Sequence, residues 1–359
     1  MIEYIIKGIL LFIPTLVIIT LISFSISRLA PGDPAALKVG AGADGNMSGS
    51  TGINAKIIEL VRKQWNLDKP VWQQYVIWMG DMLMLDFREA FANGQVNLSA
   101  LKTRSAPYFG DSFQDNRPVL EKLIERVPVT LFMNIAAVFL AYIIAIPLGI
   151  YSATNQGSFL DKLSTFLLFA LHSLPTFWVG TLAITFLCNY EFLSLFPSGG
   201  LRSPNFSVNW SFFRQMNDYA AHLVLPMIIY TYGSFAYISR QMRSAMLETV
   251  RQDYIRTARA KGVSEKKVIF VHALRNSLIP IITLLAGILP GLIGGSVIIE
   301  TIFSIPGMGE LSFKALVARD YPMIMAVFTI SAILTLVGIL ISDILYSFAD
   351  PRIAYSKKN

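Results

Sequence analysis

The side chains best suited to specific polar contacts gather in one segment, Asp253-Tyr-Ile-Arg-Thr-Ala-Arg-Ala-Lys-Gly-Val-Ser-Glu-Lys-Lys, between two long apolar stretches. Arg and Lys side chains carry several N–H donors each and can hold carboxylate or carbonyl oxygens of another molecule. Ala258, Ala260 and Val263 alternate with these charges, and small residues permit close approach by a second protein. Two interpretations follow: a docking surface for a soluble partner, which the small residues favour, or a basic loop resting on anionic lipid.

Sequence motifs for phosphate, metal or covalent chemistry are not found. The sequence has neither Gly-x-x-x-x-Gly-Lys-[Ser/Thr], which cradles ATP phosphates, nor His-Glu-x-x-His, which holds zinc. The three histidines, His172, His222 and His272, are fifty residues apart, and the single cysteine, Cys188, cannot form an intrachain disulfide. We therefore expect no catalytic, cofactor-binding or metal-binding residue in this chain, and we do not expect an enzyme.

A helical hairpin must position the basic residues. Residues 250–261 are rich in Arg, Ala and Lys and predict a helix, and Gly262 can adopt the left-handed conformation that ends one. Ser264 stands where a second helix, 265–276, needs its N-cap, and Glu265 lies in the first turn, where the helix dipole favours an acid.

Long charge-free stretches flank this hairpin. The 359-residue chain is 54% hydrophobic and 15% charged, whereas a soluble domain is about 25% charged. Six stretches of at least 20 residues contain no Asp, Glu, Lys or Arg: 8–27, 127–160, 163–190, 219–239, 276–299 and 322–342. Because about 20 apolar residues cross a membrane as a helix, the sequence predicts an all-α membrane protein with six transmembrane helices. The first is expected to be retained, since Arg28-Leu-Ala-Pro-Gly-Asp is a poor signal-peptide cleavage site.

The placement of charge predicts the orientation in the membrane. Residues 240–275 hold nine Lys and Arg against three Asp and Glu, whereas residues 28–126 hold twelve against eleven. Short basic loops stay in the cytoplasm, and long loops cross largely regardless of charge. We therefore expect 28–126 outside and both termini in the cytoplasm. The net charge of +7 sits mainly in one loop, which argues against nucleic acid as a partner.

The long outer segment carries its own helical patterns. Residues 54–64 and 70–85 are predicted to be helical, residues 90–116 irregular, and residues 119–126 an amphipathic helix that leads into the second span.

The basic hairpin resembles the coupling-loop signature of binding-protein-dependent ABC importer permeases. Ala258, Gly262 and Leu274 match the Ala, Gly and Leu of that pattern. Arg256, Thr257 and Arg275 replace its usual Glu, first Ala and Pro, and these replacements are similar to the peptide-importer branch, the "B"-type permeases for dipeptides, oligopeptides and nickel. Further segments resemble the same branch: Leu29-Ala-Pro-Gly-Asp-Pro, Leu67-Asp-Lys-Pro, Arg117-Pro-Val, Glu300-Thr-Ile-Phe-Ser-Ile-Pro-Gly-Met-Gly, Arg319-Asp-Tyr-Pro and Asp350-Pro-Arg. The resemblance leaves out 40–53 and 90–113.

This resemblance implies a type I ABC importer permease fold and one permease subunit of an ATP-driven importer in the bacterial inner membrane. The implied layout is an N-terminal transmembrane helix at 1–28, an extracytoplasmic region at 29–126, a five-helix core at 127–349 with its coupling loop at 246–276, and a cytoplasmic tail at 350–359. The implied partners are a homologous permease in a heterodimer, two ATPase subunits that bind ATP and Mg, an extracytoplasmic binding protein, and membrane lipid.

The resemblance also implies two sets of site residues. The residues expected to couple to the ATPases are Asp253, Tyr254, Arg256, Thr257, Ala258, Arg259, Ala260, Lys261, Gly262 and Ser264. The residues expected at an extracytoplasmic gate or partner contact are Glu300, Phe303, Pro306, Gly307, Arg319 and Asp320.

The implied cargo is a dipeptide or oligopeptide, with a nickel complex or a peptide antibiotic as alternatives within the family. An ion-coupled carrier is the alternative from another class. It needs ionisable residues or repeated broken helices inside the membrane, and the sequence shows neither.

Overall fold

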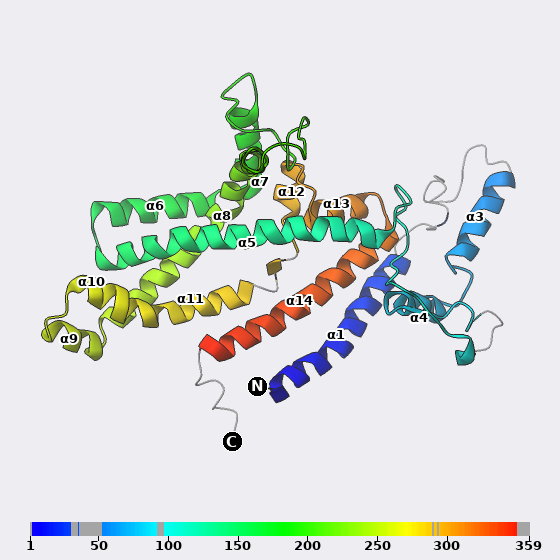
Figure 1. Cartoon of the computed structure of the whole chain (residues 1–359), viewed down its shortest axis with the longest axis horizontal. Coiled ribbons are helices and arrows are strands. Elements are labelled where there is room, and N and C mark those ends of the chain that lie inside the picture. Colours follow the sequence, from blue (N-terminus) through cyan, green and yellow to red (C-terminus); the bar gives the residue numbers. More distant parts are fainter. Residues whose placement is uncertain are drawn as a thin grey trace. The chain divides into compact units, whose positions relative to one another are not determined.

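The computed structural model is almost entirely helical, and it describes residues 2–29, 35, 52–91, 97–288, 291–292 and 294–349 (Figure 1). The predicted tail at 350–359 and most of the 40–53 stretch lie outside these described residues. The α-helices are α1 (Ile2–Leu29), α3 (Gly52–Gln64), α4 (Val71–Met82), α5 (Val119–Thr154), α6 (Phe159–Ser173), α7 (Thr176–Ala183), α8 (Phe212–Val250), α9 (Asp253–Ala260), α10 (Glu265–Lys267), α11 (Leu274–Ile288), α12 (Val297–Ile302), α13 (Met308–Val317) and α14 (Tyr321–Ala349). The remaining elements are the strands β1 (Leu85–Asp86) and β2 (Lys102–Thr103), the 3₁₀ helix η1 (Leu98–Ala100), and the π-helices η2 (Ile184–Cys188) and η3 (Val268–Ala273).

Five helices within the described residues are long and apolar enough to cross a membrane, and a bent pair makes up to six. The five are Leu10–Leu29, Val119–Thr154, Phe212–Val250, Glu265–Leu285 and Tyr321–Ile344. The bent pair corresponds to the predicted span 163–190, in which α6 and the α7–η2 segment meet at an angle of 92°.

Pro175 explains this bend. The residue before a proline is pushed out of the helical region, and Leu174 is extended, with φ −83° and ψ 126°. The predicted span 163–190 is therefore two helices that meet at Pro175.

The chain divides into two compact units, one made of residues 1–8, 127–310 and 334–359, the other of residues 9–126 and 311–333. We refer to the first as the core unit and to the second as the loop unit. Helices α1, α5, α13 and α14 have residues in both.

In the core unit, α8 packs against α6, α7 and α11, and α12 packs against α7. One apolar cluster includes Leu225, Ile229, Ile299 and Phe303, all at most 5% exposed. A second apolar cluster lies where α8 ends and contains Met242, Met246, Ile255, Val268, Ala273 and Ile281. The hairpin is built on this second cluster.

In the loop unit, Phe24 of α1 packs against α4, with its ring centroid 5.4 Å from that of Tyr75 and 6.1 Å from that of Trp78. Strands β1 and β2 pair antiparallel, with Leu85 opposite Thr103. The predicted helices at 54–64 and 70–85 correspond to α3 and α4, and the predicted helix at 119–126 is the first part of the continuous α5.

Candidate functional site

The basic segment forms a tight helical hairpin in the core unit, shown beside α11 in Figure 1. Helix α8 ends at Val250, and a short turn at Arg251 and Gln252 precedes α9, so the helix begins three residues later than predicted. Gly262 has φ +75°, the left-handed conformation expected of it, and an added Cβ would meet no atom within 4 Å. A side chain at position 262 would therefore be opposed by backbone strain alone.

The second arm of the hairpin departs from the predicted helix 265–276. Only α10 is α-helical at its start, and the chain continues as the π-helix η3 before α11 begins. Ser264 occupies the N-cap position, with ψ 142°, but its side chain makes no capping hydrogen bond. The predicted position of Ser264 is thus right, and the predicted side-chain contact is wrong.

Ile255 anchors α9 to the core unit. Its side chain is fully buried and packs in the same cluster as Met242, Met246 and Val268. Complete burial of an isoleucine side chain stabilises a fold by about 1.5–3 kcal/mol. Ile255 is not among the predicted coupling residues, although an apolar residue alone in a charged helix is a signal for an anchor.

Two polar contacts fix the hairpin further. The Asn276 amide donates to the Tyr254 hydroxyl at 2.7 Å, which joins α9 to the start of α11. Arg259 donates to both carboxylate oxygens of Glu265, at 2.6 and 3.1 Å, across the Gly262 turn. Hydrogen bonding to this carboxylate raises the pKa of Arg259. Because the pair is largely exposed, we assign it the modest stabilisation of a surface ion pair.

The ten predicted coupling residues lie on this one hairpin, and nine of them are exposed, with Ala258 half-buried. The Arg256 side chain is 72% exposed and lies 3.6 Å from the carboxylate of Asp253, which is 96% exposed. Arg256 can therefore turn to an external acid with little loss, whereas Arg259 is already engaged with Glu265 within the hairpin. The arrangement is a rigid arm with an open, charged outer surface.

The six predicted gate residues do not form one cluster. Glu300, Phe303, Pro306 and Gly307 belong to the core unit, and Arg319 and Asp320 belong to the loop unit.

Glu300 is 3% exposed, and all of its polar contacts are internal. The Thr130 hydroxyl donates to it at 3.2 Å, and the backbone N–H of Glu310 donates at 3.0 Å. Burial raises the pKa of Glu300, and these hydrogen bonds oppose that rise. A Cβ at Gly307 would come within 2.6 Å of both Glu300 and Thr130, so only glycine fits there. The carboxylate thus holds the loop before α13 in place.

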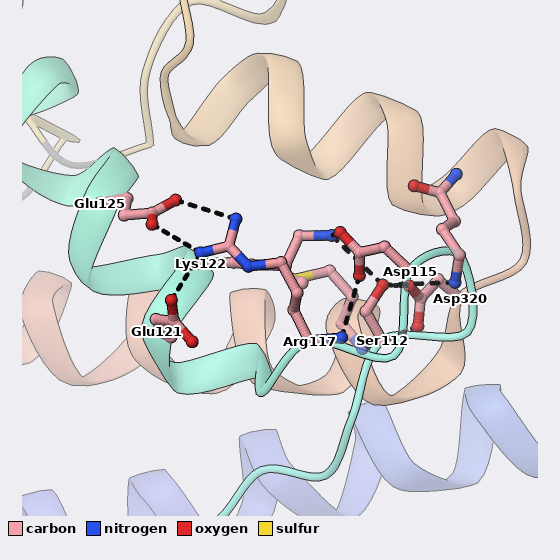
Figure 2. A network of polar contacts seen from close by, with 9 residues as sticks. Ser112, Asp115, Arg117, Glu121, Lys122, Glu125 and Asp320 are labelled. Carbon is pink, nitrogen blue, oxygen red and sulfur yellow. Dashed lines mark hydrogen bonds and ion pairs between the residues drawn. The ribbon is translucent and has the colours of Figure 1, made fainter.

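Asp320 belongs to a polar network in the loop unit that is centred on Ser112 (Figure 2). The Ser112 hydroxyl donates to Asp320 at 2.5 Å, and the Lys122 ammonium donates to Ser112 at 3.2 Å and to Asp115 at 2.9 Å. Ser112 and Asp320 are at most 1% exposed, and Lys122 is 8% exposed. The Asp320 carboxylate also accepts the backbone N–H of Met323 at the start of α14. We call these residues the Ser112 network.

Arg117 lies at the edge of this region, between Glu121 and Glu125 in Figure 2. Its guanidinium donates to Glu121 at 2.7 Å and to Glu125 at 2.6 Å. These carboxylates are one and two turns into α5, so Arg117 ties the incoming chain to the first two turns of that helix. Arg117 enters the prediction only through the family resemblance, and the partners of Ser112 and Lys122 were not predicted from the sequence.

These contacts show where the six predicted gate residues lie, and their role at a gate or partner contact stays a prediction. Glu300, Phe303 and Asp320 are buried within the chain, where they position backbone or fill the core. Arg319 is exposed, with φ +51°, and Pro306 is half-buried. A contact with another protein can be made directly by Arg319 and Pro306, and the buried residues can influence it only by holding the loops.

The sequence matches the family described as "Binding-protein-dependent transport system inner membrane component" over residues 145–355, and the N-terminal part of such components over residues 1–134. The chain belongs to this family. It is therefore an ABC importer permease, a multi-pass inner-membrane protein, and not an enzyme.

Two curated relatives match over nearly their whole length. The oligopeptide transport system permease protein AppB of Bacillus subtilis is 38% identical, with 99% of this chain and 100% of the relative covered. The dipeptide transport system permease protein DppB of Lactococcus lactis is 33% identical, with 98% and 99% covered. A chain of the inward-facing MetNI methionine ABC transporter is 18% identical to this chain, with a TM-score of 0.50. The match covers 65% of this chain and 98% of the MetNI chain. This likeness confirms the predicted fold class.

Proposed function

We propose that this chain forms half of the translocation pathway for dipeptides or oligopeptides that an extracytoplasmic binding protein delivers. The names of the two curated relatives support this cargo, and both align with the chain almost from end to end. An ion-coupled carrier is not favoured, because the family is one of binding-protein-dependent importers.

The proposed assembly contains this chain, a homologous second permease, two cytoplasmic ATPases that bind ATP and Mg, and the binding protein. The chain itself binds no nucleotide in this proposal, in keeping with the lack of a P-loop sequence. Selectivity for peptides rests mainly with the binding protein, so the permease needs few fixed polar contacts to its cargo.

In the proposed orientation the hairpin and both termini face the cytoplasm, and residues 29–126 face outward. The basic excess at 240–275 supports it. Single cysteines at the exposed Ser264 and Ser99, introduced with Cys188→Ser, test it in intact cells. An impermeant thiol reagent should label position 99 and spare position 264, and the reverse pattern would exclude this orientation.

The observation that carries the proposed mechanism is the construction of the hairpin. Ile255, the Tyr254–Asn276 hydrogen bond and the Arg259–Glu265 pair join α9 firmly to the helices behind it. A force applied to its exposed face would therefore move α8 and α11 rather than bend the hairpin. ATP-driven closure of the ATPases pulls on α9, and the spans change from inward-open to outward-open.

Two glycines with equal geometry provide a matched test. Gly262 and Gly157 have φ of +75° and +76°, and a Cβ at either position would meet nothing within 4 Å. Valine at each should therefore cost a similar 1–2 kcal/mol or so of backbone strain. Gly157 lies in the turn between α5 and α6, outside the hairpin.

The measurements are recovery of the ATPases with the purified permease and peptide-stimulated ATP hydrolysis in liposomes. We expect Gly262→Val to insert normally but to lose ATPase recovery or coupling, and Gly157→Val to retain both. Equal behaviour of the two variants would show that the hairpin has no special part in coupling.

A further inference from the structure

A cavity of about 160 Å³ lies entirely within the loop unit. Its walls come from the end of α1, from α4, from the segment before α5 and from the start of α14. The lining combines aromatic rings with a small number of charged groups, as small-molecule sites do. Nothing in the proposed transport mechanism uses this cavity.

Arg28 is the cation in this cavity that lacks a carboxylate. Arg88 also lines it, but Arg88 is paired with Asp81, which Arg104 contacts as well. The Arg28 guanidinium lies over the ring of Phe24, 5.0 Å from its centroid, and its Nε is buried. Among the described residues, no hydrogen bond or ion pair reaches Arg28.

A second donor lies on the same aromatic ring. The Trp78 ring centroid is 6.1 Å from that of Phe24, and its buried indole N–H finds no acceptor in the described part of the chain. Burying a donor without an acceptor is costly. Two such donors around one ring, one of them charged, fit an anionic oxygen group such as a phosphate.

The cavity also offers a place for a cation. Asp111 lines it and accepts a hydrogen bond from the Tyr108 hydroxyl at 3.1 Å, and no Arg or Lys of the described chain pairs with it. The rings of Trp65 and Phe113 stack beside it with centroids 4.4 Å apart, and aromatic faces attract ammonium groups. The charges that remain, Arg28 and Asp111, suit a group carrying both a phosphate and an amine.

The position of Arg28 on α1 indicates where such a group would come from. Arg28 is the second-last residue of the membrane span Leu10–Leu29, at the level where a span meets the headgroup region. Val17 and Leu21 are 43% and 48% exposed. They lie eleven and seven residues before Arg28, which places them with Phe24 and Arg28 on one stripe of the helix, and this stripe offers an apolar surface for acyl chains beside the cavity.

We infer that this cavity binds an aminophospholipid headgroup, with the phosphate at Arg28 and the Trp78 N–H, the amine towards Asp111, and the acyl chains along Leu21 and Val17. A peptide carries the same two kinds of charge, but it has no acyl chain to cover the apolar stripe. A bound lipid would join the end of α1 to α4 and to the segment before α5 and hold this region at the membrane surface.

The test uses the full chain, purified in detergent with the subunits that accompany it and stripped of native lipid. Native mass spectrometry measures binding of dihexanoyl phosphatidylethanolamine, dihexanoyl phosphatidylglycerol, phosphoethanolamine, inorganic phosphate and trialanine. We expect the ethanolamine lipid to bind best. Loss of a hydrogen bond to a charged group should weaken it by about tenfold or more in Arg28→Gln. Arg62→Gln, on an exposed position of α3, is the matched control and should bind as the parent chain does.

Two more variants separate the parts of the site. Asp111→Asn should remove the preference for ethanolamine over glycerol lipid while retaining binding of both. Trp78→Phe keeps an aromatic ring but removes the N–H donor, so it should weaken the binding of both lipids. If Arg28→Gln does not fold, the Trp78→Phe variant tests whether the cavity binds the phosphate.

The inference is overturned if neither Arg28→Gln nor Trp78→Phe alters lipid binding. Tighter binding of trialanine than of any lipid, with loss in Arg28→Gln, would assign the cavity to peptide instead. Equal affinity for phosphoethanolamine, inorganic phosphate and the lipid would show that the cavity takes free anions and that the apolar stripe contributes nothing.

Discussion

The hairpin of α9 and α10 keeps its charged side chains at the surface, whereas the Ser112 network keeps its charges inside the loop unit. In the hairpin, an apolar residue, Ile255, supplies the anchor, and Arg256 remains 72% exposed. In the network, Asp320 and Lys122 are nearly covered and are satisfied by Ser112 and Asp115. Charged residues thus form a surface for an external contact in the hairpin, whereas in the Ser112 network they hold segments of one unit together.

This difference separates two questions that mutagenesis often confounds. Changes to buried groups should alter the stability of a unit, and changes to exposed groups should alter binding to a partner. The expected changes in free energy are therefore largest for the buried groups and smallest for the exposed ones.

The largest effect is expected from Ile255→Ala. Truncating a buried isoleucine costs about 2–5 kcal/mol, and here the loss falls on the contact between α9 and the cluster at the end of α8. Hydrogen exchange should become faster at 253–260, and coupled ATP hydrolysis should fall. Leu60→Ala, at a position 66% exposed on α3, is the control and should change neither measurement.

Asp320→Ala should destabilise the loop unit and spare the hairpin. It removes the acceptor of the buried Ser112 hydroxyl and the cap at Met323. Hydrogen bonds to a charged group contribute about 1.5–3 kcal/mol each at most. We expect a lower melting temperature in detergent with normal recovery of the ATPases. The exposed Asp68→Ala provides the baseline, and a Tm equal to that baseline would refute the structural role of the network.

Arg256→Glu should change stability by less than about 1 kcal/mol, because its pair with Asp253 is open to solvent. Its effect on recovery of the ATPases should nevertheless exceed that of Asp320→Ala. Normal ATPase recovery with this variant would mean that the exposed face of α9 does not meet the ATPases.

The Arg259–Glu265 pair offers a sharper form of the same comparison. Arg259→Glu alone breaks the ion pair across the Gly262 turn. The double variant, Arg259→Glu with Glu265→Arg, restores an ion pair in which the two charges have exchanged positions. If Arg259 acts only within the hairpin, the exchange should recover coupling. Persistent loss in the double variant would instead indicate that Arg259 contacts the partner directly.

The hairpin turn could be predicted because its signal is local. Gly262 follows a helix-forming run, and only the left-handed conformation at that position closes the hairpin. The first, second, fourth and sixth spans could be predicted for a similar reason, since each contains one continuous charge-free stretch. The third is broken at Pro175, and α11 ends at Ile288 within the predicted fifth span 276–299. The start of α9 at Asp253 and the π-helix η3 were not predictable from these patterns, because packing around Ile255 and Val268 determines them.

The bend at Pro175 and the Ser112 network were missed for different reasons. A proline in a membrane helix produces anything from a slight kink to a break, and its surroundings decide which. Ser112, Lys122 and Asp320 lie up to 208 residues apart in the chain, so no local pattern connects them. Buried polar networks of this kind depend on tertiary structure, because their members lie in separate segments of the sequence.

The most direct test of the account is whether α9 lies against an ATPase subunit in the assembled transporter. A single cysteine at Ala260, an exposed residue at the end of α9, can carry a photoactivatable maleimide in the Cys188→Ser background. Irradiation of transporters that remain active should join this position to an ATPase, whereas the same label at Leu60 should give no such product. Active transporters in which position 260 reacts only with lipid would contradict the proposed role of the hairpin.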